Sequence, residues 1–290
     1  MFALLSAASL LLQAVISVHT ELVAVPVTVT DRRGHPLNGL RQGDFRVFED
    51  GRLRPIVAFR QGDEPVTLGL IVDRSQSMQS KTPALLAAVS AVLESSRPDS
   101  ELFAVDCNDR VSFALRDGRT FTNDGGELRA ALTAIRAEGR TALYDGMIQG
   151  LQHLQRGRTN RRVLIVVSDG GDNASRATYA DVLALAHRSD AVIYAIGLVG
   201  APLMDKEENG GVLKRLCRDT GGAAYFPRTL EETAAVSAEV ARSVREQYTL
   251  GFAPGPRGDG PAFRTITVTV TAEGRGRLRI RTRSGYVVEP

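Results

Sequence analysis

The side chains best suited to chemistry follow a run of strand-forming residues in the sequence VTLGLIVDRSQSM. Asp73 ends this run, and Ser75 and Ser77 follow it at alternate positions. This spacing puts one carboxylate and two hydroxyls on a single tight loop. Such hard oxygen ligands suit Mg²⁺ or Mn²⁺. The loop leaves a predicted buried strand and enters a predicted helix, which is where open α/β sheets place their ligands. The motif is weak by itself, because Ser77 could simply cap the helix.

Two further polar segments follow predicted strands or begin predicted helices. Thr141 and Asp145 lie in GRTALYDG, where we expect Thr141 to cap the following helix. Asp169 and Asp172 lie in SDGGDN, directly after the apolar strand VLIVV. Because loops at the carboxyl ends of parallel strands converge on one edge of the sheet, these side chains should meet Asp73 there. Asp145 and Asp172 are interpreted as solvated acids at helix starts, with a place just behind the ligands as the alternative.

Strand and helix patterns alternate from Val66 to Gln247, which predicts an α/β fold with a doubly wound, mostly parallel sheet. The predicted strands are 66–72, 101–107, 111–115, 162–168, 191–197 and 222–226. The predicted helices are 81–95, 127–137, 142–155, 179–188, 212–220 and 230–247. The short pair at 101–115 indicates a hairpin, and therefore one antiparallel edge.

β-rich segments flank this region on both sides. Strand patterns occur at 21–30, 45–51 and 54–60 and again at 248–253, 263–272 and 277–283. Neither segment is large enough to form a stable domain alone. Because the two ends of a domain often lie close together, we predict that residues 20–63 and 247–290 form one β-sandwich, into which an α/β domain at 64–246 is inserted.

The first 19 residues are predicted to be a signal peptide. Residues 1–20 contain no Asp, Glu, Lys or Arg, and their middle, FALLSAASLLLQAVI, is apolar. We therefore expect an exported protein, periplasmic or secreted. The alternatives are membrane association through an uncleaved N-terminal segment, or a strand or helix of the folded domain.

Composition narrows the possible functions. A net charge of +3 over 290 residues, with no dense Lys or Arg run, gives nucleic-acid binding no electrostatic footprint. No P-loop or other small-molecule cofactor motif occurs. Cys107 lies in a predicted strand and Cys217 in a predicted helix. They are interpreted as two buried small hydrophobes, and a disulfide between them is left open.

Taken together, DRSQSM, TALYDG and SDGGDN resemble a von Willebrand factor A-type domain with a metal-ion-dependent adhesion site. The resemblance covers about residues 64–246, and the flanks look like those of a bacterial subgroup of exported proteins. It implies Mg²⁺ or Mn²⁺ held by hydroxyls directly, by a threonine directly or through water, and by carboxylates directly or through water. The hydroxyls would belong to Ser75 and Ser77, the threonine would be Thr141, and the carboxylates would belong to Asp73 and Asp169. The family usually has Gly at position 76, so Gln76 would be strained if its φ were positive.

The favoured hypothesis is a divalent-cation-dependent protein-binding module. With only two carboxylates, the ion would stay electrophilic, and an Asp or Glu of a partner would complete its shell. An ion would also hold both carboxylates ionised. The alternatives are a structural or assembly protein with a vestigial metal site, and a metal-assisted hydrolase. Against an enzyme, no His lies near these motifs and no G-x-S-x-G occurs.

Overall fold

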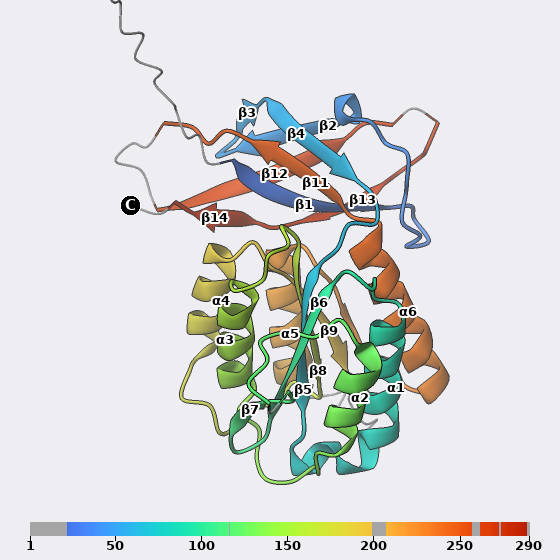
Figure 1. Ribbon diagram of the computed structural model, residues 1–290. Coiled ribbons are helices and arrows are strands. Elements are labelled where there is room, and N and C mark those ends of the chain that lie inside the picture. Colours follow the sequence, from blue (N-terminus) through green and yellow to red (C-terminus); the bar gives the residue numbers. More distant parts are fainter. Residues whose placement is uncertain (1–21, 116, 199–206, 257–261, 273, 289–290) are drawn as a thin grey trace, which may run out of the picture.

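The computed structural model shows a β-rich body stacked on one end of an α/β body (Figure 1). The described residues are 22–115, 117–198, 207–256, 262–272 and 274–288. The predicted signal peptide at 1–19 lies outside them. None of the helices in the described part is long and apolar enough to cross a membrane.

The α/β body is built on a six-stranded sheet in the order β10-β9-β8-β5-β6-β7. All neighbours pair in parallel except β6 and β7, which form the expected antiparallel edge. The predicted fold class is therefore confirmed. The strands are β5 (Thr67–Asp73), β6 (Glu101–Cys107), β7 (Val111–Phe113), β8 (Arg162–Ser168), β9 (Val192–Gly197) and β10 (Ala224–Tyr225).

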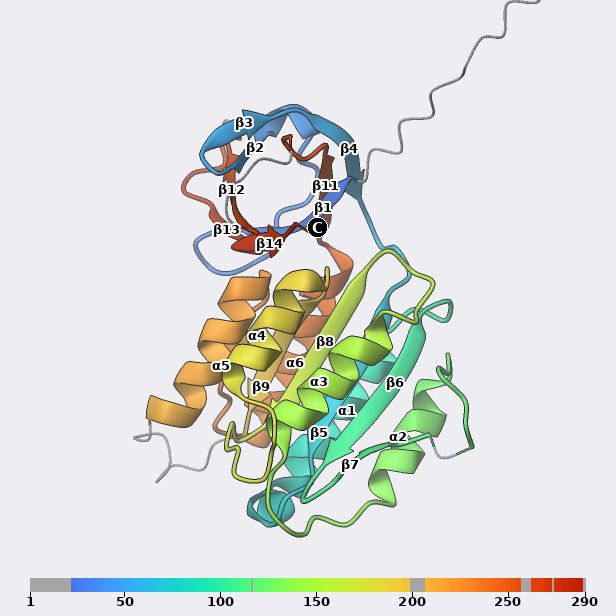
Figure 2. The ribbon, with the colours of Figure 1, turned by 90° about the vertical axis from the view of Figure 1, so that its left-hand side faces the viewer.

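Helices cover both faces of this sheet (Figure 2). One face packs against α1 (Thr82–Glu94), α2 (Gly125–Thr133) and α6 (Leu230–Arg245). The other packs against α3 (Leu143–Leu154), α4 (Tyr179–Arg188) and α5 (Glu207–Thr220). Every residue of β5 is buried, as a strand covered on both faces requires.

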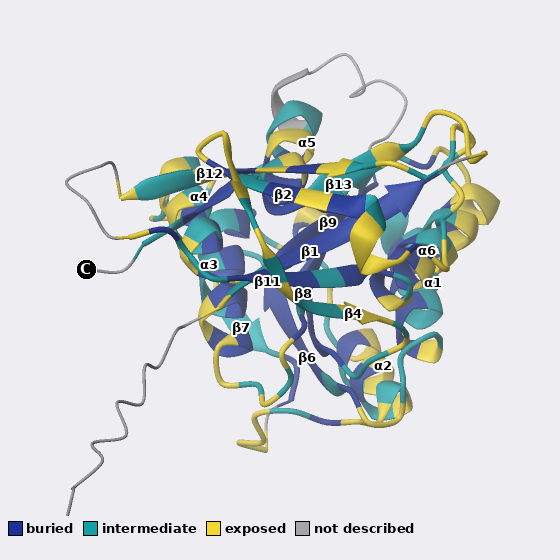
Figure 3. Ribbon diagram, turned by 90° about the horizontal axis from the view of Figure 1, so that it is seen from above, coloured by how far each residue is buried: buried dark blue, intermediate teal, exposed yellow. Residues whose placement is uncertain are grey.

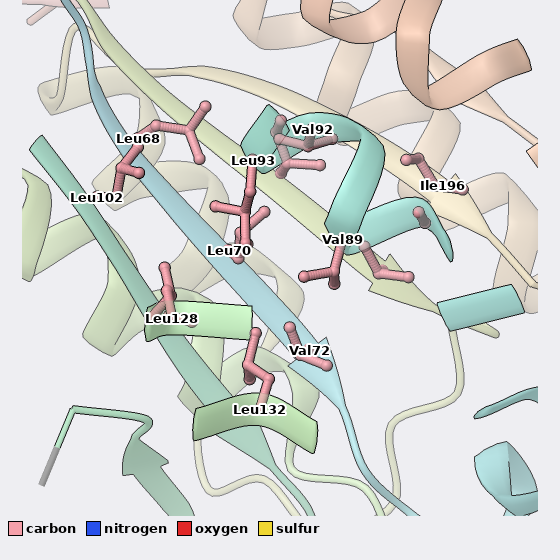
Figure 4. Packing of buried hydrophobic residues seen from close by; sticks show 14 of the residues in the cluster. Leu68, Leu70, Val72, Val89, Val92, Leu93, Leu102, Leu128, Leu132 and Ile196 are labelled. Atoms are coloured by element: carbon pink, nitrogen blue, oxygen red, sulfur yellow. The ribbon is translucent and has the colours of Figure 1, made fainter. Parts of the chain in front are cut away.

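The side chains of β5 alternate between two apolar clusters. Leu70 and Val72 point into the cluster formed with α1 and α2, near Leu128 and Leu132 (Figure 4). Ile71 points into the other cluster, under α3. A Cβ added to Gly150 of α3 would lie 2.6 Å from Ile71 Cδ1, so glycine lets this helix lie close to the sheet. This close packing holds α3 against β5.

The β-rich body is a sandwich of two four-stranded antiparallel sheets, β13-β1-β11-β4 and β14-β12-β2-β3. Strands from both ends of the chain pair directly, β1 with β11 and β2 with β12. Their inward residues form one apolar core. The strands are β1 (Val23–Thr30), β2 (Phe45–Glu49), β3 (Arg52–Arg54), β4 (Ile56–Gln61), β11 (Tyr248–Phe252), β12 (Phe263–Val270), β13 (Arg279–Thr282) and β14 (Gly285–Val287).

Polar contacts join the sandwich to the α/β body. Arg161, just before β8, donates to the carbonyl of Gly62, which directly follows β4. Arg283 donates to His187 O at 2.8 Å and contacts Asp190 at 2.5 Å. Seen from above, the strands of the central sheet are buried beneath the sandwich, and exposed residues gather on loops and outer faces (Figure 3). The sandwich therefore covers one end of the sheet, opposite the end where β5 and β8 terminate (Figure 1).

Some element boundaries differ from those predicted. The helix expected at 81–95 is preceded by a 3-10 turn, η2 (Gln76–Lys81), which carries the chain away from β5. The helix expected at 127–137 is α2, which begins two residues earlier and ends at Thr133. The strand expected at 222–226 is reduced to two residues. Cys107 and Cys217 are both buried free thiols, so they do not form a disulfide.

Candidate metal site

Three polar segments meet at the carboxyl edge of the parallel sheet. Main-chain bonds hold them together: Gln76 N donates to Gly139 O at 3.0 Å, and Asn173 N donates to Thr141 O at 3.0 Å. The loop after β5, the loop before α3 and the loop after β8 therefore form one unit. The edge is the one expected for parallel strands.

Four of the five predicted ligands are joined through their own polar atoms. The hydroxyls of Ser75 and Ser77 lie 3.1 Å apart, and Ser77 Oγ donates to Asp169 Oδ2 at 2.8 Å. Asp73 Oδ1 accepts the main-chain N–H of Ser75 at 3.0 Å. Asp73 is completely buried and Asp169 is 7% exposed, so both carboxylates face protein rather than bulk water.

Thr141, the fifth, comes to this edge through its main chain. Its N–H donates to Asn173 Oδ1 at 2.8 Å, and the residue is 4% exposed. Within the described part of the chain, no hydrogen bond joins its hydroxyl to the other four side chains. The prediction that Thr141 caps the following helix is wrong, because Ala142 is the N-cap of α3 and side chains of the loop after β8, Asp172 and Ser175, accept the first N–H groups of the helix.

Asp145 and Asp172 tie the loop after β8 to the start of α3. Asp172 Oδ1 accepts the N–H of Tyr144 at 3.2 Å and the hydroxyl of Ser175 at 2.6 Å. The Asp145 carboxylate accepts the N–H groups of Arg176 at 3.0 Å and Ala177 at 2.8 Å. Both acids thus have fixed structural partners, which the interpretation as solvated helix-start acids did not foresee.

Gln76 fits the loop without a left-handed backbone. Among the described residues other than glycine, Asp50 is the only one with positive φ, so the strain considered for Gln76 does not arise. The reason is the 3-10 turn, in which Gln76 is the first residue and donates its N–H to Gly139 O. Met78 of the same turn is fully buried and anchors it to the core.

Two further residues belong to the site and were not predicted as part of it, Ser168 and Lys81. Ser168 Oγ donates to Asp73 Oδ2 at 2.6 Å and accepts the N–H of Gly170 at 2.9 Å. Lys81 Nζ lies 3.0 Å from Asp169 Oδ2, the oxygen that also accepts from Ser77. A signal for Ser168 existed in its position, a hydroxyl ending an otherwise apolar strand. Lys81 follows Ser77 by one turn, a spacing that has meaning only once the turn is known to be helical.

The two carboxylates have different electrostatic surroundings. Burial raises the pKa of Asp73, and the hydrogen bonds from Ser168 and Ser75 offset this only in part. Burial also acts to raise the pKa of Asp169, but hydrogen bonds from Lys81 and Ser77 outweigh it and lower the pKa. A divalent cation beside Asp73 would favour its charged form and so act against the burial.

Comparisons with known proteins agree with this architecture. Residues 68–171 match the family model of the von Willebrand factor type A domain. No curated protein matches the chain in sequence. Among solved structures, the chain is similar to a von Willebrand factor type A protein from Catenulispora acidiphila. The TM-score is 0.52 at 14% identity, over 85% of this chain and 74% of that one.

Two further structures are similar over a smaller share of this chain. An aerotolerance-related membrane protein from Bacteroides fragilis gives a TM-score of 0.50 at 10% identity, covering 62% of this chain and 98% of that one. A D319A mutant of the PilB minor pilin from Streptococcus sanguinis gives 0.50 at 12% identity, covering 64% of this chain and 62% of that one. At these identities the likeness concerns the fold.

Proposed function

Since residues 68–171 carry a von Willebrand factor type A domain, we propose that this protein is a divalent-cation-dependent protein-binding module. Domains of this family are typically interaction modules rather than enzymes. The proposed ligands of Mg²⁺ or Mn²⁺ are Asp73, Ser75, Ser77, Thr141 and Asp169. When bound, the ion supplies positive charge and a coordination position that an Asp or Glu of a partner protein can fill.

The spacing of the oxygen atoms is the observation that carries this proposal. Neighbouring oxygens in an octahedral Mg²⁺ shell with bonds of 2.0–2.1 Å lie roughly 3 Å apart. The Ser75 and Ser77 hydroxyls are separated by 3.1 Å, and Ser77 Oγ and Asp169 Oδ2 by 2.8 Å. Two neighbouring pairs among these three donors are thus already at the separation that one ion requires.

The surrounding residues keep these oxygens in place. Ser168 and the main chain of Ser75 hold Asp73, and Asn173 holds the main chain of Thr141. Asp145 and Asp172 stiffen the loop behind them. The described part of the chain contains no cluster of three or more His, Cys, Asp or Glu that could hold a metal ion. This hydroxyl-rich donor set therefore favours a hard cation over zinc.

The positions of the two histidines packed within the fold, His153 and His187, support binding rather than hydrolysis. His153 lies among Phe103, Phe113 and Phe121 and bonds to Thr120 O, and His187 packs on Phe263. Neither is placed to act as a base at the carboxyl edge of the sheet. Burial lowers the pKa of both, which suits neutral rings packed in the fold.

We propose that the sandwich and the α/β body are separate units with boundaries near residues 64 and 246, and that the protein is exported. In that arrangement the sandwich occupies the end of the sheet away from the proposed site (Figure 1). The carboxyl edge is then free to face a partner. Deleting residues 248–290 tests the division: limited proteolysis should expose 21–60 while 64–246 resists digestion. Protection of 21–60 after the deletion would contradict it.

Calorimetry with Mn²⁺ and Mg²⁺ tests the proposed function directly. The parent protein should bind one ion, and Ser77→Ala and Asp73→Asn should abolish or strongly weaken that binding. Asp99→Ala is the matched control, because this exposed acid pairs with Arg97 away from the site. Equal binding by the parent and Ser77→Ala would contradict the ligand assignment.

The partner step has its own test. Proteins retained from an extract by the immobilised parent in Mg²⁺ should be released by EDTA and should not be retained by Ser77→Ala. Changing one Asp or Glu of an identified partner to Ala should then weaken the complex. Retention that survives chelation would place the interaction away from this site and favour the structural or assembly role.

A further inference from the structure

Lys81 occupies the proposed metal site with its own positive charge. Its ammonium lies 3.0 Å from Asp169 Oδ2, the oxygen that also accepts the Ser77 hydroxyl. The Lys81 side chain is 17% exposed and the Asp169 side chain 9%. An ammonium and a metal ion would therefore need lone pairs of the same buried oxygen.

The two cations cannot share this oxygen at low cost. Like charges a few ångströms apart repel strongly where water is largely excluded. Asp169 is the only acidic partner of Lys81 within the described part of the chain. The Lys81 ammonium, 3.0 Å away, already balances the charge of the Asp169 carboxylate. A metal ion must thus replace the ammonium rather than join it.

Lys81 is also placed so that it can leave. It is the last residue of η2 and the N-cap of α1, and its side chain caps nothing there. An ammonium on a four-carbon stem can turn toward water without moving the main chain. The contact is therefore exchangeable, unlike the main-chain bonds that hold Asp145 in place.

We propose that Lys81 is an internal competitor of the metal ion, and that ion binding at this site exchanges the Lys81 ammonium out to solvent. This inference rests on the proposed function. The exchange lowers the metal affinity that the five oxygen ligands would otherwise have. It also brings a free ammonium to the rim of the site whenever an ion is bound.

Metal titration of matched variants tests the competition. With Mn²⁺ alone as the probe, Lys81→Met should bind at least about tenfold more tightly than the parent. Lys214→Met is the charge-matched control, because Lys214 lies over the Phe226 ring instead. It should bind as the parent does. Equal dissociation constants for Lys81→Met and Lys214→Met would overturn the proposal.

Amine labelling separates exchange from a simple loss of charge. The sequence has only three lysines, at 81, 206 and 214, so mass spectrometry can follow each one. Saturating Mg²⁺ should speed the modification of Lys81 and leave that of Lys214 unchanged. Continued protection of Lys81 with Mg²⁺ bound would overturn the proposal even if Lys81→Met binds more tightly.

The binding results distinguish a failure of the proposed metal function from a failure of the Lys81 competition. If the parent binds the ion and neither lysine variant changes the affinity, only the competition is wrong. If the parent and Lys81→Met both fail to bind Mn²⁺, the proposed metal function is wrong and the competition with it. If Lys81→Met binds Mn²⁺ and the parent does not, both the metal site and the competition by Lys81 are supported.

Discussion

Buried carboxylates occur in both bodies of the molecule, but the groups that contact them differ. Glu49 of the sandwich is 1% exposed and is held by two arginines, with Arg54 at 2.7 Å and Arg264 at 3.0 Å. Tyr286 and the N–H of Gly255 donate to it as well. Asp73 and Asp169 receive hydroxyls, main-chain N–H groups and a single lysine.

The difference appears in the pKa values. Burial acts to raise the pKa of Glu49, but its hydrogen bonds to Tyr286, Arg264, Gly255 and Arg54 lower it to about 2. For Asp73, burial wins and the pKa rises. The sandwich therefore neutralises its own buried acid with fixed cations from both ends of the chain. The site supplies mainly acceptor oxygens and one exchangeable cation, which suits it to take a cation from solution.

Replacing Glu49 gives the largest expected effect. In Glu49→Gln, the guanidinium groups of Arg54 and Arg264 lose their buried countercharge, so stability should fall by about 3–5 kcal/mol. Urea denaturation measures the change. Glu94→Gln is the control, since this exposed acid pairs only at 3.5 Å with Arg129. A loss of stability below about 1 kcal/mol for Glu49→Gln would contradict the role of Glu49 as the buried countercharge of Arg54 and Arg264.

Lowering the pH should remove the contribution of Glu49 to stability without any substitution. The pKa of Glu49 is about 2 in the folded protein against an ordinary 4.5. Its contribution is therefore present above the ordinary value and lost as pH falls through the folded one. About 3 kcal/mol of stability should disappear between these limits. Stability measured against pH in the parent and in Glu49→Gln checks this, because the variant should have a flatter acid limb. Parallel curves would assign the acid loss to other groups.

A divalent cation should stabilise the folded protein only through the proposed metal site of the α/β body. A ligand that binds the native state at a hundred times its dissociation constant adds about 2.7 kcal/mol. Mg²⁺ or Mn²⁺ at that concentration should raise the melting temperature of the parent and of a Glu49→Gln variant that remains folded. It should not do so for Ser77→Ala. A rise in all three proteins would indicate binding elsewhere.

Residue patterns predicted the elements that bring the site together. The apolar runs of β5 and β8 identified a parallel sheet, and its carboxyl edge follows from that topology. The patterns also predicted most of the flanking strands, but not β3, whose three residues lie between the patterns at 45–51 and 54–60. They also did not predict β14, another strand of three residues with little periodicity.

Side-chain partners across the fold could not be predicted in this way. Lys81 meets Asp169 over a separation of 88 residues, and Glu49 meets Tyr286 over 237. Such pairs depend on the path of a 3-10 turn or on the register of a sandwich. Neither is encoded in a local pattern of apolar residues. The ligand loops were identifiable because their oxygens cluster in sequence, whereas the acid that Lys81 or Ser168 contacts across the fold depends on how the loops meet.

The smallest expected effect is also the sharpest test of the comparison, because it has the opposite sign. The pKa of Asp73 is raised in the folded protein, so its ionised form is less favourable there than in the unfolded chain. Its contribution therefore becomes unfavourable as pH rises through the ordinary value and the folded one. Asp73→Asn keeps an oxygen for the Ser75 N–H, turns an NH2 donor toward the Ser168 hydroxyl, and removes the buried charge. In EDTA at neutral pH this variant should be more stable than the parent by about 1 kcal/mol, while it loses Mn²⁺ binding.

A stabilised Asp73→Asn beside a destabilised Glu49→Gln would show that two equivalent amide-for-carboxylate changes act in opposite directions. The physical reason is that the chain's own arginines neutralise Glu49. No cation in the described part of the chain neutralises Asp73, and its buried charge therefore costs stability. Urea denaturation of both variants in the same buffer, with EDTA and then with Mg²⁺, measures the contrast. A loss of stability in Asp73→Asn in EDTA would mean that Ser75 and Ser168 already satisfy this carboxylate. The site would then be a hydrogen-bonded loop closure with no need of an ion.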